Sequence, residues 1–320
     1  MKYKLSEIGK VVGGGTPSTK HPEYYTGSGI PWLTPKDLSG YDKMYISKGG
    51  RDITQEGLEN SSAKLLPANS VLVSSRAPIG YVAIAENEIA TNQGFKSIIP
   101  NRELVIPEYL YFVMKTSKQD LEQIASGSTF KEVSTKVMSN FEVEIPDLDE
   151  QRKVLDYLLP ITRKIEKNSR INDNLSKFRE LLYMRLIQSS DVKEVKLTEL
   201  FNIAYGKNIA KSELTKSGTK VFGANGLIGY TQKPSIISAP TVTITSRGSG
   251  SGYVSYLNIG NAFLTNNLLY LNENKNLGLS FSYETIKSAN PKQFVTGSAQ
   301  PQLTIKNLSQ SLVKIPSDIN

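Results

Sequence analysis

Two patterns of apolar residues recur along the chain. Short runs rich in β-branched residues, at 70–73 and 241–244, are bounded by turn residues and predict strands. Apolar positions spaced by three and four over 107–115 and 279–288 predict short helices. Strand patterns outnumber helix patterns in both parts of the chain, so the sequence predicts mixed, strand-rich domains of the α+β class.

The stretch 147–190 differs, because it contains no glycine and carries one apolar seam. Its apolar residues lie mainly three and four positions apart, which is typical of a helix that packs along another helix. A proline costs about 3 kcal/mol inside a helix but is tolerated in the first turn. Pro160 therefore predicts a short helix over 149–158 and a long one over 161–188. The predicted seam consists of Leu158, Ile161, Ile165, Asn168, Ile171, Asn172, Leu175, Phe178 and Leu182. Packing against the chain's own domain is the alternative.

The two strand-rich parts are also similar to each other in sequence. Five motifs recur in the same order, about 170–190 residues apart. The matched segments are 3–8 and 195–200, 73–82 and 244–254, 90–93 and 264–267, 127–134 and 297–304, and 143–146 and 313–316. They predict two copies of one domain, at 1–147 and 191–320, joined by a helical region at 148–190.

Composition narrows the function classes. The chain has 320 residues, with 38 Lys and Arg against 30 Asp and Glu, and the net charge of +8 favours a polyanionic partner. The absence of cysteine excludes disulfides, thiolate metal sites and cysteine nucleophiles. The single histidine, His21, excludes a multi-histidine metal site and is expected in a surface turn. We find no signal peptide and no apolar run of membrane-spanning length, and expect a soluble, cytoplasmic protein without a metal.

Several short motifs together carry a family resemblance. They are Gly14-Gly15-Thr16-Pro17-Ser18, Ile30-Pro31-Trp32, and Ile145-Pro146 followed by Asp149-Glu150-Gln151 and a long helix. With the duplication, they make the chain similar to the specificity subunit of type I restriction–modification systems. The resemblance covers the whole chain, and its specificity lies in the order and duplication of the motifs.

The resemblance implies a non-catalytic protein that directs enzymes to DNA. In that family each of two target-recognition domains reads one half of a split sequence in double-stranded DNA, and long helices set the spacing. The subunit recruits methyltransferase subunits, which use S-adenosylmethionine, and the full system adds endonuclease subunits that act in phage defence. This chain itself is then expected to bind no cofactor.

One feature of the family pattern is not found in this sequence. A second long helix follows the second domain in the family, whereas this sequence ends at Asn320. We therefore expect helix 161–188 to pair with the same helix of another chain in a homodimer, since a two-fold dimer needs only a self-complementary surface.

Basic and small polar residues are the candidates for DNA contacts. Phosphate contacts position a protein on DNA, and base-edge contacts select the sequence. Arg76 and Arg247 occupy matching places after a predicted strand. The full set is Lys20, Lys36, Ser75, Arg76, Lys131, Lys207, Lys211, Lys233, Ser246, Arg247 and Gln300. Structural roles for the arginines and ordinary surface positions for the lysines are the alternatives.

Other functions remain open from the residues alone. A stand-alone or truncated DNA-binding protein that dimerises through its helix, without restriction activity, is the nearest alternative. A nuclease or methyltransferase is disfavoured, because we find no Asn/Asp-Pro-Pro-Tyr/Phe motif and no phosphate-binding loop. A protein-interaction scaffold would leave the positive charge without a role.

Overall fold

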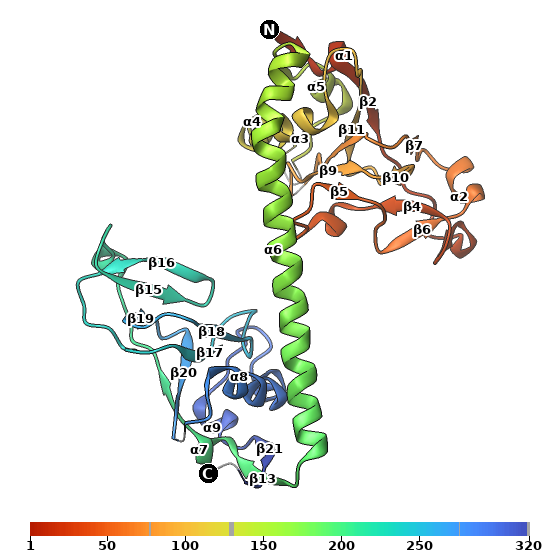
Figure 1. Ribbon diagram of the computed structural model, residues 1–320. Coiled ribbons are helices and arrows are strands. Elements are labelled where there is room, and N and C mark those ends of the chain that lie inside the picture. The colour runs from red at the N-terminus through yellow and green to blue at the C-terminus, as the bar shows by residue number, and fades with distance from the viewer. Residues whose placement is uncertain (77, 128–130, 275, 319–320) are drawn as a thin grey trace. The chain divides into compact units, whose positions relative to one another are not determined.

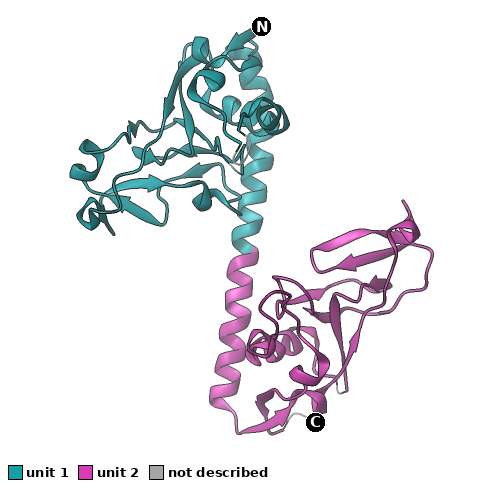
Figure 2. Ribbon diagram, turned by 180° about the vertical axis from the view of Figure 1, so that it is seen from behind, with its two compact units in different colours: residues 1–171 teal, residues 172–320 magenta. Residues whose placement is uncertain are grey.

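The protein folds as two compact units, residues 1–171 and 172–320 (Figure 2). The structure, a computed structural model, describes residues 1–76, 78–127, 131–274 and 276–318. None of the helices in these ranges is long and apolar enough to cross a membrane. The boundary between the units falls inside a long helix that contributes to both.

Unit 1 contains two five-stranded sheets and one strand pair (Figure 1). The sheet orders are β3-β6-β4-β10-β7 and β2-β11-β8-β9-β5, and β1 pairs with β12. The strands are β1 (Lys2–Lys4), β2 (Gly9–Gly13), β3 (Tyr25–Thr26), β4 (Ile30–Leu33), β5 (Tyr45–Ile46), β6 (Arg51–Ile53), β7 (Leu65–Leu66), β8 (Val71–Val73), β9 (Val82–Ala85), β10 (Ile89–Thr91), β11 (Lys96–Pro100) and β12 (Glu142–Glu144). The helices are α1 (Leu5–Ile8), α2 (Gln55–Glu59), α3 (Pro107–Thr116), α4 (Lys118–Ile124), α5 (Thr135–Ser139) and the start of α6 (Leu148–Ser189).

Unit 2 repeats this plan in a smaller form. Its sheet orders are β14-β20-β17-β18 and β16-β15-β19, and β13 pairs with β21. The strands are β13 (Val192–Lys196), β14 (Phe201–Tyr205), β15 (Thr219–Gly223), β16 (Gly226–Thr231), β17 (Thr241–Thr245), β18 (Val254–Leu257), β19 (Ala262–Leu264), β20 (Leu268–Glu273) and β21 (Leu312–Pro316). The helices are α7 (Leu197–Leu200), α8 (Leu279–Ser288) and α9 (Ile305–Leu308). The predicted α+β class, strand-rich and duplicated, is confirmed.

The repeated motifs form the frame of each unit. Leu5 and Leu197 begin matching short helices and are fully buried in the cores beneath α3 and α8. The carboxylate of Glu7 accepts a hydrogen bond from the Lys4 amide at 2.6 Å, and Glu199 caps its own helix in the same way at 2.9 Å. Each copy therefore begins with a short helix that is anchored in the core by a buried leucine and capped by a glutamate.

A close main-chain approach explains one glycine in each copy. A side chain at Gly14 would lie 2.0 Å from the Asn92 carbonyl oxygen, and one at Gly206 would lie 2.3 Å from that of Thr265. No side chain fits at these distances, so the sheet geometry requires glycine at both places.

The long helix α6 is continuous through 42 residues. Pro160 lies inside it and is exposed, so the predicted break between 158 and 161 was wrong. Contacts on both sides of the proline hold the helix. Before it, Leu155 is buried, and after it, the Glu166 carboxylate accepts a hydrogen bond from the Met44 amide at 2.8 Å. These contacts offset the hydrogen bond that proline removes.

Polar side chains are among the contacts that attach each unit to α6. In unit 1, Gln151 is fully buried and makes three hydrogen bonds of 2.8–2.9 Å to main-chain groups of Leu104, Ile106 and Pro146. Those bonds use both N–H groups and the oxygen of its amide.

In unit 2 the attachment is ionic. Arg179 Nε lies 2.6 Å from Glu284 Oε1, and the side chain of Glu284 is only 4% exposed. The guanidinium also lies 4.4 Å from the ring centre of Tyr283 and 5.6 Å from that of Tyr256. Burial alone would lower the pKa of Arg179, but the hydrogen bond and charge of Glu284 outweigh it and raise that pKa. The contact with Glu284 therefore stabilises the charged form of Arg179.

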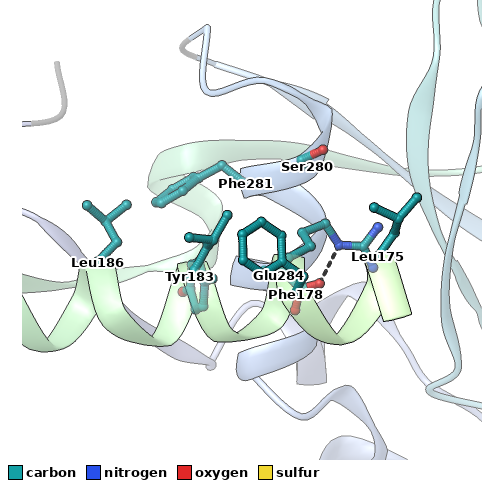
Figure 3. Close-up of a pocket in the computed structure, with 9 residues that line it drawn as sticks. Leu175, Phe178, Tyr183, Leu186, Ser280, Phe281 and Glu284 are labelled. Carbon is teal, nitrogen blue, oxygen red and sulfur yellow. Dashed lines mark hydrogen bonds and ion pairs between the residues drawn. The ribbon is translucent and has the colours of Figure 1, made fainter. Parts of the chain in front are cut away.

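The predicted seam of α6 lies largely in solvent. The side chains of Ile161, Ile165, Ile171, Leu175, Phe178 and Leu182 are 51–59% exposed. Leu158 is half-buried, and Asn168 and Asn172 are exposed. In unit 2 part of the seam borders a groove of about 360 Å³, which is lined by Leu175, Phe178 and Leu186 from α6 and by Phe281 from α8 (Figure 3). Helix pairing through this face stays a prediction.

Candidate nucleic-acid interface

In unit 1, Arg76 follows β8 and belongs to an ion cluster with Lys96 and Glu132. Its main chain forms an isolated bridge with Glu132. Arg76 Nε lies 2.9 Å from Glu132 Oε2, and Lys96 Nζ lies 3.0 Å from Glu132 Oε1. One carboxylate thus binds two cations, which come from separate segments of the domain.

The two cations keep Glu132 ionised. Burial by itself would raise the pKa of this carboxyl, but the hydrogen bonds and charges of Lys96 and Arg76 outweigh burial and bring the pKa below its usual value. The side chain of Lys96 is only 9% exposed. Removing Glu132 would leave this buried ammonium with the Gln93 carbonyl and the Ser75 hydroxyl but no carboxylate, which is costly.

The matching place in unit 2 contains Arg247 beside a neutral amide. Arg247 follows β17 and forms the same main-chain bridge, here with Gln302. The main-chain hydrogen bonds of Ser75 and Ser246 place Leu269 where unit 1 has Lys96. Within the part of the chain that the structure describes, Arg247 forms no ion pair. Its guanidinium is exposed and carries an uncompensated charge.

Arg247 borders an open cavity of about 610 Å³. The main-chain amide of Gly248 donates to the Pro301 carbonyl at 3.0 Å, and the Ser251 hydroxyl donates to the same carbonyl at 2.9 Å. Gly248 has φ +89°, a conformation that favours glycine, and a side chain there would meet open space. The lining comprises Arg247, Gly248, Ser249, Ala299, Pro301 and the polar residues Ser298, Gln300 and Gln302.

The prediction that two serine hydroxyls contact DNA was wrong. Ser75 and Ser246 are both fully buried. The Ser75 hydroxyl donates to the Gly94 carbonyl at 3.1 Å, and the Ser246 hydroxyl donates to the Asn266 carbonyl at 3.2 Å. The serines recur in both copies because they join neighbouring loops, and phosphate oxygens cannot reach them.

The remaining polar candidates lie on the surface. Lys20, Lys36 and Lys131 in unit 1, and Lys207, Lys211 and Gln300 in unit 2, are exposed. Lys233 is 2.7 Å from Glu213, so this lysine is already paired. The hydrogen bond from Lys233 and the one from the Ala210 amide lower the pKa of Glu213. A contact of these residues with DNA stays a prediction.

Two aromatic or titratable residues have structural positions. Trp32 is buried and donates a hydrogen bond to the Gly15 carbonyl at 3.0 Å. His21 is exposed in a turn, 2.8 Å from Glu23, and stacks on Tyr24. Across the described ranges, no group of three or more acidic or histidine side chains is placed to hold a metal ion.

Sequence reasoning missed Lys96, Glu132 and Gln302. Glu132 and Gln302 lie at matching places in the repeated segments 127–134 and 297–304, and the difference between them was visible in the sequence. The sequence does not reveal that Glu132 and Gln302 pair with Arg76 and Arg247, which lie far earlier in the chain.

Charge is distributed unequally between the units. Unit 1 has 22 Lys and Arg against 21 Asp and Glu, whereas unit 2 has 16 against 9. Nearly all of the net positive charge therefore belongs to unit 2, the unit that contains Arg247. A polyanion would be attracted mainly there.

Comparison with known proteins identifies the family. The model of the type I restriction modification DNA specificity domain matches residues 1–177 and again 189–320. The chain belongs to this family. The two matched stretches agree with the duplication seen in the motifs and in the sheets, and the predicted resemblance is confirmed.

Relatives of known name show the same assignment. The chain is 44% identical over 176 residues to the type I restriction enzyme MjaIX specificity subunit of Methanocaldococcus jannaschii, covering 54% of this chain and 40% of that protein. It is 30% identical over 160 residues to the EcoR124I/EcoR124II specificity subunit of Escherichia coli, covering 48% and 39%. The matches thus span about two fifths of each relative's length.

A solved structure shows the same fold. The S subunit of a type I restriction–modification system from M. genitalium superposes with a TM-score of 0.61 at 18% identity, covering 99% of this chain and 84% of that one. At this identity the similarity concerns the fold alone.

Proposed function

We propose that this chain selects the DNA sequence on which a type I restriction–modification enzyme acts, and that it performs no chemistry itself. The observation that carries the proposal is the double match to the DNA specificity domain, one match for each unit. The exposed cations of both copies and the positive charge of unit 2 support it, because nonspecific DNA affinity comes from phosphate contacts.

Each copy is proposed to read one half of a bipartite target. The copies share buried frame residues, whereas their exposed loop cations differ in place and number. A shared frame with different loops suits two unlike half-sites. The continuous helix α6 is proposed to fix the spacer between them.

The proposed partners are methyltransferase subunits that use S-adenosylmethionine and, through them, endonuclease subunits. The test mixes this chain with the methyltransferase subunit encoded beside it. We expect light scattering to show a complex, and we expect DNA methylation only when this chain is present. Methylation by the subunit alone, with the same sequence preference, would contradict the proposal.

A homodimer through the exposed seam of α6 is the second part of the proposal. The support is the run of large apolar side chains that are more than half exposed. Substituting Leu175→Asp places a charge on the seam, and Asn174→Asp adds the same charge beside it. Sedimentation of the wild type should show a dimer that L175D loses and N174D keeps. A strictly monomeric wild type at high concentration would rule the dimer out.

A further inference from the structure

The two repeated arginines differ in what neutralises them. Arg76 in unit 1 shares Glu132 with the buried Lys96, whereas Arg247 in unit 2 lies beside the neutral Gln302. The main-chain bridges are the same, but the carboxylate beside Arg76 is replaced by an amide beside Arg247. We propose that Arg247 is a DNA phosphate contact and that Arg76, held by Glu132, has mainly a structural role.

The surroundings of Arg247 suit a phosphate oxygen. An arginine binds phosphate with several donors in a fixed plane, and it does so best where no carboxylate competes. Among the residues that the structure describes, no acidic one lines the cavity beside Arg247, and Ser249, Ser298 and Gln300 add polar groups. Two bonds to the Pro301 carbonyl tie the loop 247–251 to the opposite wall. The contact is thus preorganised by the fold.

The surroundings of Arg76 oppose the same role. Its Nε is occupied by Glu132, whose low pKa keeps a negative charge beside the guanidinium at neutral pH. An approaching phosphate would meet that carboxylate as well, and like charges repel. Drawing Arg76 away would also leave Glu132 with Lys96 alone.

The charge distribution gives independent support. Unit 2 carries an excess of seven cations, 16 against 9, and unit 1 an excess of one, 22 against 21. Contacts with DNA phosphates require cations that no carboxylate neutralises. Each phosphate that such a cation neutralises releases counterions, which favours binding. Unit 2 is therefore proposed to supply more of the sequence-independent affinity. This inference rests on the proposed DNA-binding function and assigns part of it to one site.

The test measures DNA affinity of the full chain as a function of salt, with fluorescent duplex DNA of random sequence and with a selected target. Arg247→Ala should weaken binding to both DNAs by roughly tenfold and reduce the slope of log affinity against log salt by about 0.9. Arg76→Ala should change the affinity and slope less than R247A does.

Two variants at Gln302 distinguish the effect of a negative charge beside Arg247 from the effect of losing the Gln302 side chain. Gln302→Glu recreates the carboxylate that unit 1 has at this place, and it should weaken binding about as much as R247A. Gln302→Ala removes the same side chain without adding charge and should weaken binding less than Q302E does. Circular dichroism of each variant checks that it is folded.

The outcomes distinguish this inference from the proposed function. If the wild type binds no DNA, the proposed function fails. If it binds, but R247A and Q302E leave affinity and slope unchanged, the phosphate assignment is overturned. A loss confined to the selected target also overturns it, because that result indicates a base contact.

Discussion

The two units place their ionic groups at different points of the same frame. In unit 1 a carboxylate and two cations gather behind the loop after β8, where unit 2 has Arg247 and an amide. At helix α6 unit 1 uses the neutral Gln151, whereas unit 2, at a different place on the helix, uses the ion pair of Arg179 and Glu284. The matching positions 132 and 302 therefore carry charge in one copy and not in the other.

This contrast shows which parts of a duplicated domain tolerate change. The apolar cores and the main-chain bridges coincide, as Leu5 and Leu197 illustrate. A buried ion pair adds little net stability over a neutral group of similar shape, so it can be exchanged for one. Removing only one partner, in contrast, leaves a buried charge and is costly.

The largest expected effect is at the ionic attachment of α6. Arg179→Ala leaves the buried Glu284 with only Lys287, whose Nζ is 3.9 Å away. We expect unit 2 to lose about 3 kcal/mol of unfolding free energy. Hydrogen exchange, read separately for each unit in urea, would measure this loss.

The neutral attachment in unit 1 provides the comparison. Gln151→Ala removes three hydrogen bonds and should cost about 2 kcal/mol, confined to unit 1. An equal loss from both variants, or a loss in the wrong unit, would break the distinction between an ionic and a neutral attachment.

The next effect concerns the cluster around Glu132. Glu132→Ala leaves Lys96 buried without a carboxylate, and we expect unit 1 to lose about 2 kcal/mol. The matched variant Gln302→Ala should cost less than about 1 kcal/mol, since Leu269 lies where the second cation would be. Urea unfolding of the two variants would compare them. Similar losses would show that the cluster has no special role in unit 1.

The same cluster predicts a pH dependence. The pKa of Glu132 is lowered in the folded state, so its contribution to stability is present above its ordinary value of 4.5 and is lost as the pH falls through the folded pKa. The stability difference between wild type and Glu132→Gln should therefore shrink as the pH falls from 7 to below about 4. Urea midpoints at several pH values would show this, and a constant difference would contradict it.

The smallest expected effect distinguishes free from paired lysines. Lys207 is exposed, and among the described residues it forms no ion pair, whereas Lys233 is held by Glu213. Lys207→Ala should weaken binding to random DNA by about threefold. Lys233→Ala should change it less, because its charge is already shared. Anisotropy titrations at low salt would compare them, and a larger effect of K233A would reverse the assignment.

The sequence predicted the frame well because its repeated motifs coincide with buried positions. Leu5, Leu197, Ile145 and Ile315 are all 0–1% exposed. The sequence match of 90–93 with 264–267 was shifted by one residue. Thr91 pairs with β4 in the way that Leu264, and not Thr265, pairs with β15. Short parallel strands of similar composition do not reveal a register by pattern alone.

The candidate site was less predictable. Arg76 and Arg247 were found by repetition, but their difference depends on residues that the fold brings back from far along the chain. Ser75 and Ser246 were misread because a recurring polar residue can serve the frame as well as a ligand. Pro160 was misread because tertiary contacts, which outweigh its helix-breaking cost, are absent from a one-dimensional pattern.

Selection from a random library of duplex DNA tests the central claim most directly. The purified chain, with its methyltransferase partner if required for affinity, would be used to enrich bound DNA for sequencing. We predict two unlike half-sites separated by a constant number of unselected base pairs. A single continuous motif, or no enrichment despite salt-dependent binding, would contradict the reading of one half-site by each copy.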